Sequence, residues 1–256
     1  MSKIDIKEII ENLIDTFLYA GKISIELRKD GLIKKIKEDK TPVSNGDLEV
    51  NKIITKKILE LTPNIPIVSE ESSQNKDNDN LTNFWLIDPI DGTYDYINNL
   101  DEFTINACLI QNQKPSGALV YAPAKKRLFY SFGLNYSFEL TNGKLIKLTC
   151  EKNHNNNFVR FVSHSKEIKP DIVKIHKRFK VKEYVRMKSS LKFCVIAAGE
   201  FDGYAAEARA YEWDIAAGHA ILEHAGGVVT DFDGNQILYG KKNFYNPSLI
   251  LKSKTI

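Results

Sequence analysis

At residues 85–93 the chain reads Trp-Leu-Ile-Asp-Pro-Ile-Asp-Gly-Thr, which places two carboxylates, Asp88 and Asp91, directly after an apolar run. The run from Phe84 to Ile87 is typical of a buried strand, so we expect the sheet to end at Asp88 and the backbone to turn there. The proline that follows biases Asp88 away from helical geometry, and the glycine after Asp91 permits a tight turn. This stretch therefore predicts a short loop that presents carboxylates at the end of a strand.

The loop offers oxygen donors almost exclusively. Asp88, the Ile90 carbonyl, Asp91 and the Thr93 hydroxyl are ligands that hard divalent cations prefer. An Asp-Pro turn followed by an Asp-Gly turn is also common in ordinary loops, and this segment alone favours neither interpretation. Only motifs elsewhere in the chain can decide between a metal-binding loop and an ordinary turn.

Composition excludes several classes of protein. The 256 residues suffice for one large domain or two smaller ones that share a cleft. Lys and Arg number 36 against 33 Asp and Glu, and a net charge of +3 is too balanced for a protein whose main partner is a nucleic-acid polymer. No apolar run approaches the roughly 18 residues of a transmembrane segment.

The expected compartment is the cytoplasm, with peripheral association with the inner membrane left open. Acidic residues near the N-terminus, such as Asp5 and Glu8, argue against a signal peptide. Cys108, Cys150 and Cys194 lie far apart among apolar neighbours, which predicts buried free thiols rather than disulfides or a zinc site.

The order of predicted elements changes along the chain. Two amphipathic helices open it, and closely spaced strands with short turns then predict an antiparallel sheet up to about residue 140. After about residue 150 strands and helices alternate, which favours an α/β arrangement. We expect two packed subdomains, 1–145 carrying most metal ligands and 146–256 supplying Asp214 and a wall of the substrate pocket. The expected helices are 6–18, 47–61, 170–179, 190–198 and 215–225, and the expected strands are 65–68, 84–87, 103–110, 117–121, 127–132, 138–140, 158–163 and 181–185.

Four carboxylates stand at the ends of these elements: Glu70, Asp88, Asp91 and Asp214. Taken alone, Asp214 is a suitable helix N-cap and Glu70 belongs to a solvated turn. If the four converge, two like charges about 4 Å apart repel by about 4 kcal/mol at an effective dielectric of 20, so the cluster requires protons or cations. Oxygen ligands without Cys or His favour magnesium over zinc.

Three motifs in this order resemble the inositol monophosphatase superfamily. They are Ser-Glu-Glu at 69–71, Asp-Pro-Ile-Asp-Gly-Thr at 88–93, and Trp-Asp-Ile-Ala-Ala-Gly at 213–218. Within it, Ser-Ser-Leu-Lys-Phe-Cys at 189–194 is similar to the CysQ-type 3′(2′),5′-bisphosphate nucleotidases. The resemblance implies a layered α/β/α/β/α sugar-phosphatase fold, in the α/β (α+β) class. The implied reaction is magnesium-dependent hydrolysis of adenosine 3′,5′-bisphosphate to AMP and phosphate, inhibited by lithium and belonging to sulfur metabolism.

The resemblance also implies roles for individual residues. Glu70, Asp88 and the Ile90 carbonyl would hold one magnesium ion, and Asp88, Asp91 and Asp214 a second, with Glu70 near a third. Asp47 and Thr93 would orient and deprotonate the attacking water. The implied substrate contacts are Glu70, Ile90, Asp91, Gly92, Thr93, Ser189, Lys192 and Asp214, although Lys192 is equally consistent with a solvated helix lysine.

Some positions depart from that branch. Residues 92–96 read Gly-Thr-Tyr-Asp-Tyr where relatives usually have Gly-Thr-Lys-Glu-Phe, Lys188 replaces a usual glycine, and Lys166 stands where a histidine is expected, with His164 nearby. Inositol-1-monophosphate or a related sugar phosphate is therefore the alternative substrate, and a non-catalytic metal-binding or inositide-binding module is a further alternative that Asp47 and Thr93 disfavour. The expected partner is a small phosphate ester, with the protein a monomer or homodimer.

Overall fold

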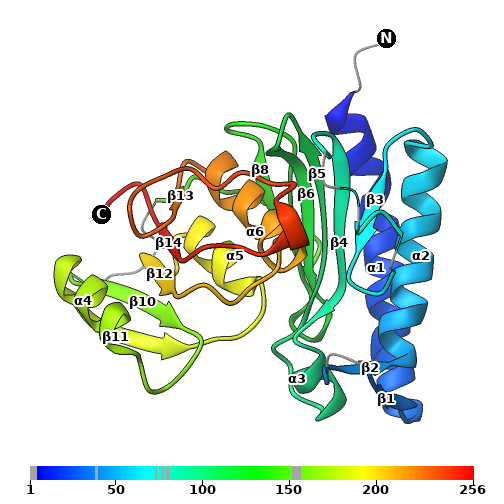
Figure 1. The fold of residues 1–256 in the computed structure, drawn as a ribbon, viewed down its shortest axis with the longest axis horizontal. Helices are drawn as coiled ribbons and strands as arrows, with labels where there is room; N and C mark the ends of the chain where they lie inside the picture. The colour runs from blue at the N-terminus through cyan, green and yellow to red at the C-terminus, as the bar shows by residue number, and fades with distance from the viewer. Residues whose placement is uncertain (1–4, 38–39, 73, 77, 79–80, 152–156) are drawn as a thin grey trace.

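The computed structural model describes residues 5–37, 40–72, 74–76, 78, 81–151 and 157–256. Its layers follow one another across the molecule in the order helix, sheet, helix, sheet, helix (Figure 1). The predicted layered α/β/α/β/α fold is confirmed.

The larger sheet forms the centre of the N-terminal part. Its order among the described residues is β3-β4-β5-β6-β7-β8-β9, with β3 parallel to β4 and every later pair antiparallel. Short turns join β5 to β9, as the spacing of the apolar runs predicts. The strands are β3 (Ile67–Ser69), β4 (Phe84–Asp91), β5 (Thr104–Gln111), β6 (Lys114–Ala122), β7 (Arg127–Ser131), β8 (Ser137–Thr141) and β9 (Lys144–Lys147).

Helices α1 (Ile6–Asp30) and α2 (Asn45–Leu61) cover one face of this sheet (Figure 1). Because side chains alternate along a strand, Trp85 and Ile87 of β4 pack toward these helices. A small hairpin, β1 (Lys34–Ile36) with β2 (Pro42–Ser44), joins the two helices.

The smaller sheet lies in the C-terminal part. Its order is β11-β10-β12-β14-β13 in the described chain, with β10 parallel to both its neighbours and β14 antiparallel to both of its own. Helix α4 packs on its outer side. The elements are β10 (Val159–Ser163), α4 (Pro170–Arg178), β11 (Val181–Arg186), α5 (Leu191–Ala197), β12 (Gly203–Ala206), α6 (Glu212–His224), β13 (Val228–Thr230) and β14 (Leu249–Lys252). Short helices α3 (Thr93–Ile97), η1 (Pro123–Lys125) and η2 (Lys242–Phe244) complete the fold.

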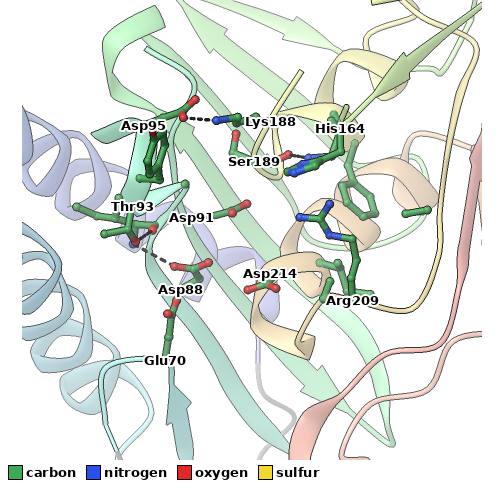
Figure 2. Close-up of a pocket in the computed structure, with 18 of the residues that line it drawn as sticks. Glu70, Asp88, Asp91, Thr93, Asp95, His164, Lys188, Ser189, Arg209 and Asp214 are labelled. Carbon is green, nitrogen blue, oxygen red and sulfur yellow. Dashed lines mark hydrogen bonds and ion pairs between the residues drawn. The ribbon is translucent and has the colours of Figure 1, made fainter. Parts of the chain in front are cut away.

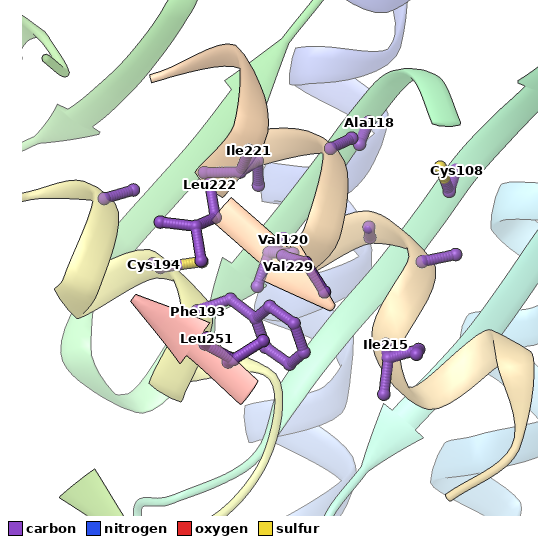
Figure 3. Close-up of a cluster of buried hydrophobic side chains, with 14 of the residues drawn as sticks. Cys108, Ala118, Val120, Phe193, Cys194, Ile215, Ile221, Leu222, Val229 and Leu251 are labelled. Carbon is purple, nitrogen blue, oxygen red and sulfur yellow. The ribbon is translucent and has the colours of Figure 1, made fainter. Parts of the chain in front are cut away.

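A single apolar core joins the two sheets through α5 and α6. Figure 3 shows Val120 of the larger sheet near Phe193 of α5; Cys108 of the sheet and Ile221 of α6 belong to the same buried cluster. A Cβ on Gly218 of α6 would stand 2.5 Å from Cγ of Phe193, so these helices require glycine for their close approach. Helix α6, which begins near Asp214, is thereby held firmly against β4, β5 and β6.

Most predicted elements are present, but several details of the prediction are wrong. The first helix does not end at residue 18: α1 continues to Asp30, because the small residues Ala20, Gly21 and Ser24 extend its buried face. Strands β1, β2, β9, β12, β13 and β14 were not predicted. β4 does not end at Ile87: it continues to Asp91, with an irregularity in its pairing with β5 between Asp88 and Asp91. A bulge of this kind tolerates the proline, because a residue that does not pair with the neighbouring strand needs no N–H donor. Asp214 is not an N-cap residue, since α6 begins at Glu212. The predicted boundary between residues 145 and 146 falls within β9, and the division into two subdomains stays a prediction.

Candidate active site

Three carboxylates from distant parts of the chain meet where β3, β4 and α6 come together. Glu70 directly follows β3, Asp88 lies in β4, and Asp214 is in the first turn of α6. One oxygen from each lies within 4.8 Å of the others, and among the described residues this is the grouping suited to a metal ion. Figure 2 shows the three side chains directed toward one another.

The irregular end of β4 aims its acidic side chains. The Ile90 N–H donates to Asp88 Oδ1 at 3.1 Å, which orients that carboxylate next to the bulge. Asp91 accepts a hydrogen bond from the Ser190 N–H at 2.5 Å, so the C-terminal part of the chain holds the second carboxylate of the motif. The predicted ligand Asp91 therefore lines the same cavity as the other three, beside them rather than within their tight group.

Asp214 contributes to the helix terminus as well as to the cluster. The Tyr211 N–H donates to Asp214 Oδ2 at 2.8 Å, which stabilises the first turn of α6. The Ser190 hydroxyl donates to the Asp214 carbonyl. Asp214 can therefore stabilise the start of the helix and belong to the carboxylate cluster at the same time.

Thr93 and Asp47 form the second feature of the site. The Thr93 hydroxyl lies 3.1 Å from Asp47 Oδ1 and 3.0 Å from the Ile90 carbonyl, and both oxygens are acceptors. Asp47 Oδ2 accepts from the N–H and hydroxyl of Ser44 at 2.8 and 2.6 Å. Burial raises the pKa of Asp47, although hydrogen bonds from Ser44 and Thr93 oppose that shift. A threonine hydroxyl held by a carboxylate in this way can pass a proton on.

The cluster is electrostatically unfavourable without a counter-charge. Burial raises the pKa of Asp88 and of Asp214 well above the ordinary range, and repulsion among the site carboxylates raises both further. Burial also raises the pKa of Asp91, while Lys192 and Ser190 oppose this. Buried, mutually repelling oxygen ligands fit a hard divalent cation, which would remove the repulsion.

Lys37 is a counter-charge that sequence reasoning missed. Its Nζ lies 3.1 Å from Glu70 Oε1 and 2.6 Å from Glu71 Oε1. Burial lowers the pKa of Lys37, but the ion pairs outweigh burial and the net shift is upward. The lysine comes from the hairpin between α1 and α2, and no motif links it to Glu70.

A cavity of about 390 Å³ opens above the carboxylates. Its two sides differ in charge: Glu70, Asp88 and Asp214 line one side, and basic side chains line the other (Figure 2). Gly92 lines the acidic side with φ +94°, and a Cβ there would stand 2.9 Å from the Glu102 carbonyl, so this turn requires glycine. The basic side carries His164, Lys188, Ser189, Lys192 and Arg209.

Lys192 is buried in this wall rather than solvated. Only 7% of the residue is exposed, its Nζ donates to the Ser189 carbonyl, and the ammonium lies 5.4 Å from the centre of the Tyr204 ring. Burial lowers the pKa of Lys192 to about 8, although Asp91 opposes the shift. Of the two interpretations open from the sequence, the solvated-lysine one is wrong.

The structure also places the residues that depart from the CysQ-type sequence pattern. Lys188 forms an ion pair with buried Asp95, and its ammonium lies 5.1 Å from the centre of the Tyr94 ring. His164 lines the cavity, whereas Lys166 does not. Arg209 lines it too and was not predicted; the signal available was a basic residue in the polar segment just before the Trp-Asp motif.

The fold and this arrangement of side chains define a phosphatase. The chain belongs to the inositol monophosphatase family, whose model matches residues 5–255. The predicted membership and the predicted hydrolase class are both confirmed.

More particular similarity is to CysQ proteins. The 3′(2′),5′-bisphosphate nucleotidase CysQ of Buchnera aphidicola is 36% identical over 204 residues, which cover 79% of this chain and 76% of that protein. CysQ of Salmonella typhimurium is 33% identical, with 82% and 85% covered. The crystal structure of CysQ from Bacteroides thetaiotaomicron has a TM-score of 0.78 at 26% identity, covering 96% of this chain and 97% of that one. The likeness within the family to CysQ-type nucleotidases is thus confirmed.

The cation expected here has a parallel among proteins of the same fold. An IMPase/NADP phosphatase solved with Mg²⁺ and phosphate has a TM-score of 0.77 at 21% identity, covering 96% of this chain and 90% of that one. The family is metal-dependent. In the described part of the chain no helix has the length and apolar character that crossing a membrane requires.

Proposed function

We propose that this protein is a magnesium-dependent 3′(2′),5′-bisphosphate nucleotidase that hydrolyses adenosine 3′,5′-bisphosphate to AMP and phosphate. The observation that carries the proposal is the convergence of Glu70, Asp88 and Asp214 beside the Thr93–Asp47 pair. The CysQ relatives support the choice of substrate. The basic wall opposite the carboxylates suits a substrate with more than one negative group.

The proposed ligand set follows from the donors present. Glu70, Asp88 and the Ile90 carbonyl would hold one magnesium ion, Asp88, Asp91 and Asp214 a second, and Glu70 would border a third, giving two to three ions. Bound there, magnesium would supply the positive charge that offsets negative charge on the phosphoryl and leaving-group oxygens.

The chain's own residues would carry out the remaining tasks. Thr93 Oγ1, which donates to Asp47, would orient the attacking water toward phosphorus; as the water attacks, its proton would pass to Thr93 Oγ1 while the threonine proton passes to Asp47. Backbone N–H groups of Gly92 and Thr93, at the start of the turn after β4, would bind the phosphate oxygens. Ser189 and Lys192 would form the opposite wall and contact the rest of the substrate.

Two further properties belong to the proposal. The compartment is the cytoplasm, which buried free thiols at Cys108, Cys150 and Cys194 support. The working unit is a monomer or a homodimer that needs no partner beyond its small phosphate ester. Peripheral membrane association, lithium inhibition and a place in sulfur metabolism stay predictions.

The test is phosphate release from three substrates in the presence of magnesium: adenosine 3′,5′-bisphosphate, inositol-1-phosphate and fructose-1,6-bisphosphate. We expect the highest kcat/KM for the nucleotide, and no release when EDTA replaces magnesium. A preference for either sugar substrate would retain the metal site and overturn the nucleotidase assignment. Absence of release from all three would favour a binding module instead.

A further inference from the structure

Four basic side chains line the cavity opposite the carboxylates: His164, Lys188, Lys192 and Arg209. A substrate with two phosphates places one at the carboxylate cluster and needs a cation for the other. Which of the four is available for that second phosphate depends on the partners that each already has.

Both lysines are already engaged within the protein. Lys188 is ion-paired with Asp95, whose side chain is only 3% exposed, and releasing Lys188 would leave that carboxylate buried without a counter-charge. Lys192 donates to the Ser189 carbonyl and also faces Asp91. Each ammonium has further N–H donors, so Lys192 can still contact the substrate, but the charge of each lysine is already balanced by a carboxylate, Asp95 or Asp91.

His164 adds hydrogen-bonding capacity but no charge. Burial, together with the nearby charges of Arg209, Lys192, Lys188 and Arg186, lowers the pKa of His164 to about 3. The imidazole is therefore neutral at physiological pH and can donate or accept one hydrogen bond without contributing a positive charge.

Arg209 differs from the other three. It is exposed, it lies in the segment between β12 and α6, and Figure 2 shows its guanidinium directed into the cavity. Among the described residues none forms an ion pair with it, and the acidic residue of its own segment, Glu207, pairs with Lys169. Its charge is thus not neutralised within the protein.

The position of Arg209 also matches the path that a nucleotide would follow. A second cavity of about 150 Å³ adjoins the first, and His164, Tyr204, Ala206 and Arg209 line both. The second cavity, which we call the outer cavity because it lies on the side of Arg209 away from the carboxylates, adds apolar side chains of Ile168 and Ile172. A ligand that extends from the carboxylates into the outer cavity would pass beside the guanidinium.

We propose that Arg209 binds the phosphate that is not hydrolysed and so makes the enzyme selective for bisphosphates. The proposal rests on the nucleotidase function proposed above. A guanidinium presents paired N–H donors that match phosphate oxygens, and hydrogen bonds between charged groups are stronger than neutral ones. Arg209 is therefore a specificity-determining residue for the second phosphate, and neutral His164 supplies a hydrogen bond beside it.

The experiment compares two substrates that share the same scissile group. Adenosine 3′,5′-bisphosphate and adenosine 3′-monophosphate differ only in the 5′-phosphate, so the ratio of their kcat/KM values reports its recognition. We expect Arg209→Gln to lower this ratio roughly 10- to 100-fold, mainly through KM for the bisphosphate, because one charge-assisted contact is lost. Arg209→Lys keeps the charge but lacks the paired N–H donors of the guanidinium, and it should lower the ratio less.

The matched control is Arg186→Gln. Arg186 also acts on His164 through its charge, yet it does not line the cavity. Its removal should leave the ratio of kcat/KM values unchanged. An equal fall of that ratio in both variants would show that only the general positive potential of the cavity matters, and this would overturn the proposal. Thermal melting with and without magnesium verifies that each variant folds.

The outcomes separate this inference from the function on which it rests. If the unmodified enzyme hydrolyses the bisphosphate well and Arg209→Gln leaves the substrate ratio unchanged, the nucleotidase assignment stands and the role of Arg209 is refuted. If the unmodified enzyme prefers inositol-1-phosphate to both nucleotides, the assignment and the inference fail together.

Discussion

Replacing Asp88 by asparagine should make the metal-free protein more stable and the magnesium-loaded protein less stable. Asp88 is 1% exposed and stands between Glu70 and Asp214. Asparagine has nearly the same shape, and its side-chain oxygen can still accept the hydrogen bond from the Ile90 N–H. The substitution therefore removes a charge and little else.

The magnitude follows from the spacing of the carboxylates. Two unit charges 4.8 Å apart repel by about 3.5 kcal/mol at an effective dielectric of 20. Asp88 has two such neighbours, but its raised pKa means that proton uptake already relieves part of the repulsion near neutral pH. We therefore expect a net gain of about 1–3 kcal/mol, or a melting temperature higher by roughly 3–10 °C in a chain of this size.

In magnesium the unmodified protein should be more stable than Asp88→Asn, the reverse of their order in EDTA. A cation at 100 times its dissociation constant stabilises the folded state by about 2.7 kcal/mol, and Asp88→Asn should lose most of this gain. Phosphate release by the variant should fall by orders of magnitude. The assay is thermal melting in EDTA and in magnesium, together with phosphate release.

The control is Asp233→Asn, which removes an exposed carboxylate outside the site and should change neither measurement. An Asp88→Asn variant that melts below the unmodified protein in EDTA would refute the argument from repulsion. Full activity in that variant would refute the place of Asp88 in the metal site.

Three further results are expected. Thr93→Ala should lower kcat by about 10²- to 10⁴-fold while magnesium still raises the melting temperature; a lost magnesium shift would contradict its proposed role. Lys188→Met should lower the free energy of unfolding by about 3 kcal/mol by leaving Asp95 unpaired, and adding Asp95→Asn should restore most of it in denaturant titrations. An unrestored double variant would argue against the pair. Because the pKa values of Asp88 and Asp214 are raised in the folded state, these two groups make the free energy of unfolding of the metal-free chain fall as pH rises above about 4. His164 and His224, whose pKa values are lowered to about 3 and about 4, make it rise up to about pH 6.5, with or without magnesium. The gap between the melting temperatures in magnesium and in EDTA should therefore widen from pH 5 to pH 8; a constant gap would contradict the argument.

The sequence was most informative where a local pattern carries the chemistry. In the sequence Asp88 and Asp91 follow an apolar run and Asp214 precedes another, so the strand and the helix that bear them could be predicted from spacing. The end of β4 was placed too early because a proline usually ends a strand, whereas here a bulge carries the backbone past it to Asp91.

The counter-charges of the site could not be predicted in the same way. Lys37 lies 33 residues from Glu70, and Lys188 lies 93 residues from Asp95. A lysine in a loop looks like a solvated side chain until the tertiary structure places a carboxylate beside it. Arg209 is the same case, because only the folded cavity distinguishes it from an ordinary surface arginine.

The burial of the larger sheet beneath α6 has a consequence for synthesis of the protein. The face of β4, β5 and β6 that α6 covers is completed early in translation, but α6 itself ends only at His224. Until then Leu86, Cys108 and Val120 lack the apolar cover that α6 gives them, and a nascent chain that exposes such a face is prone to aggregate. Ribosome stalling between residues 150 and 210 should therefore yield chains that depend on chaperones, whereas chains released beyond α6 should be able to bury that face.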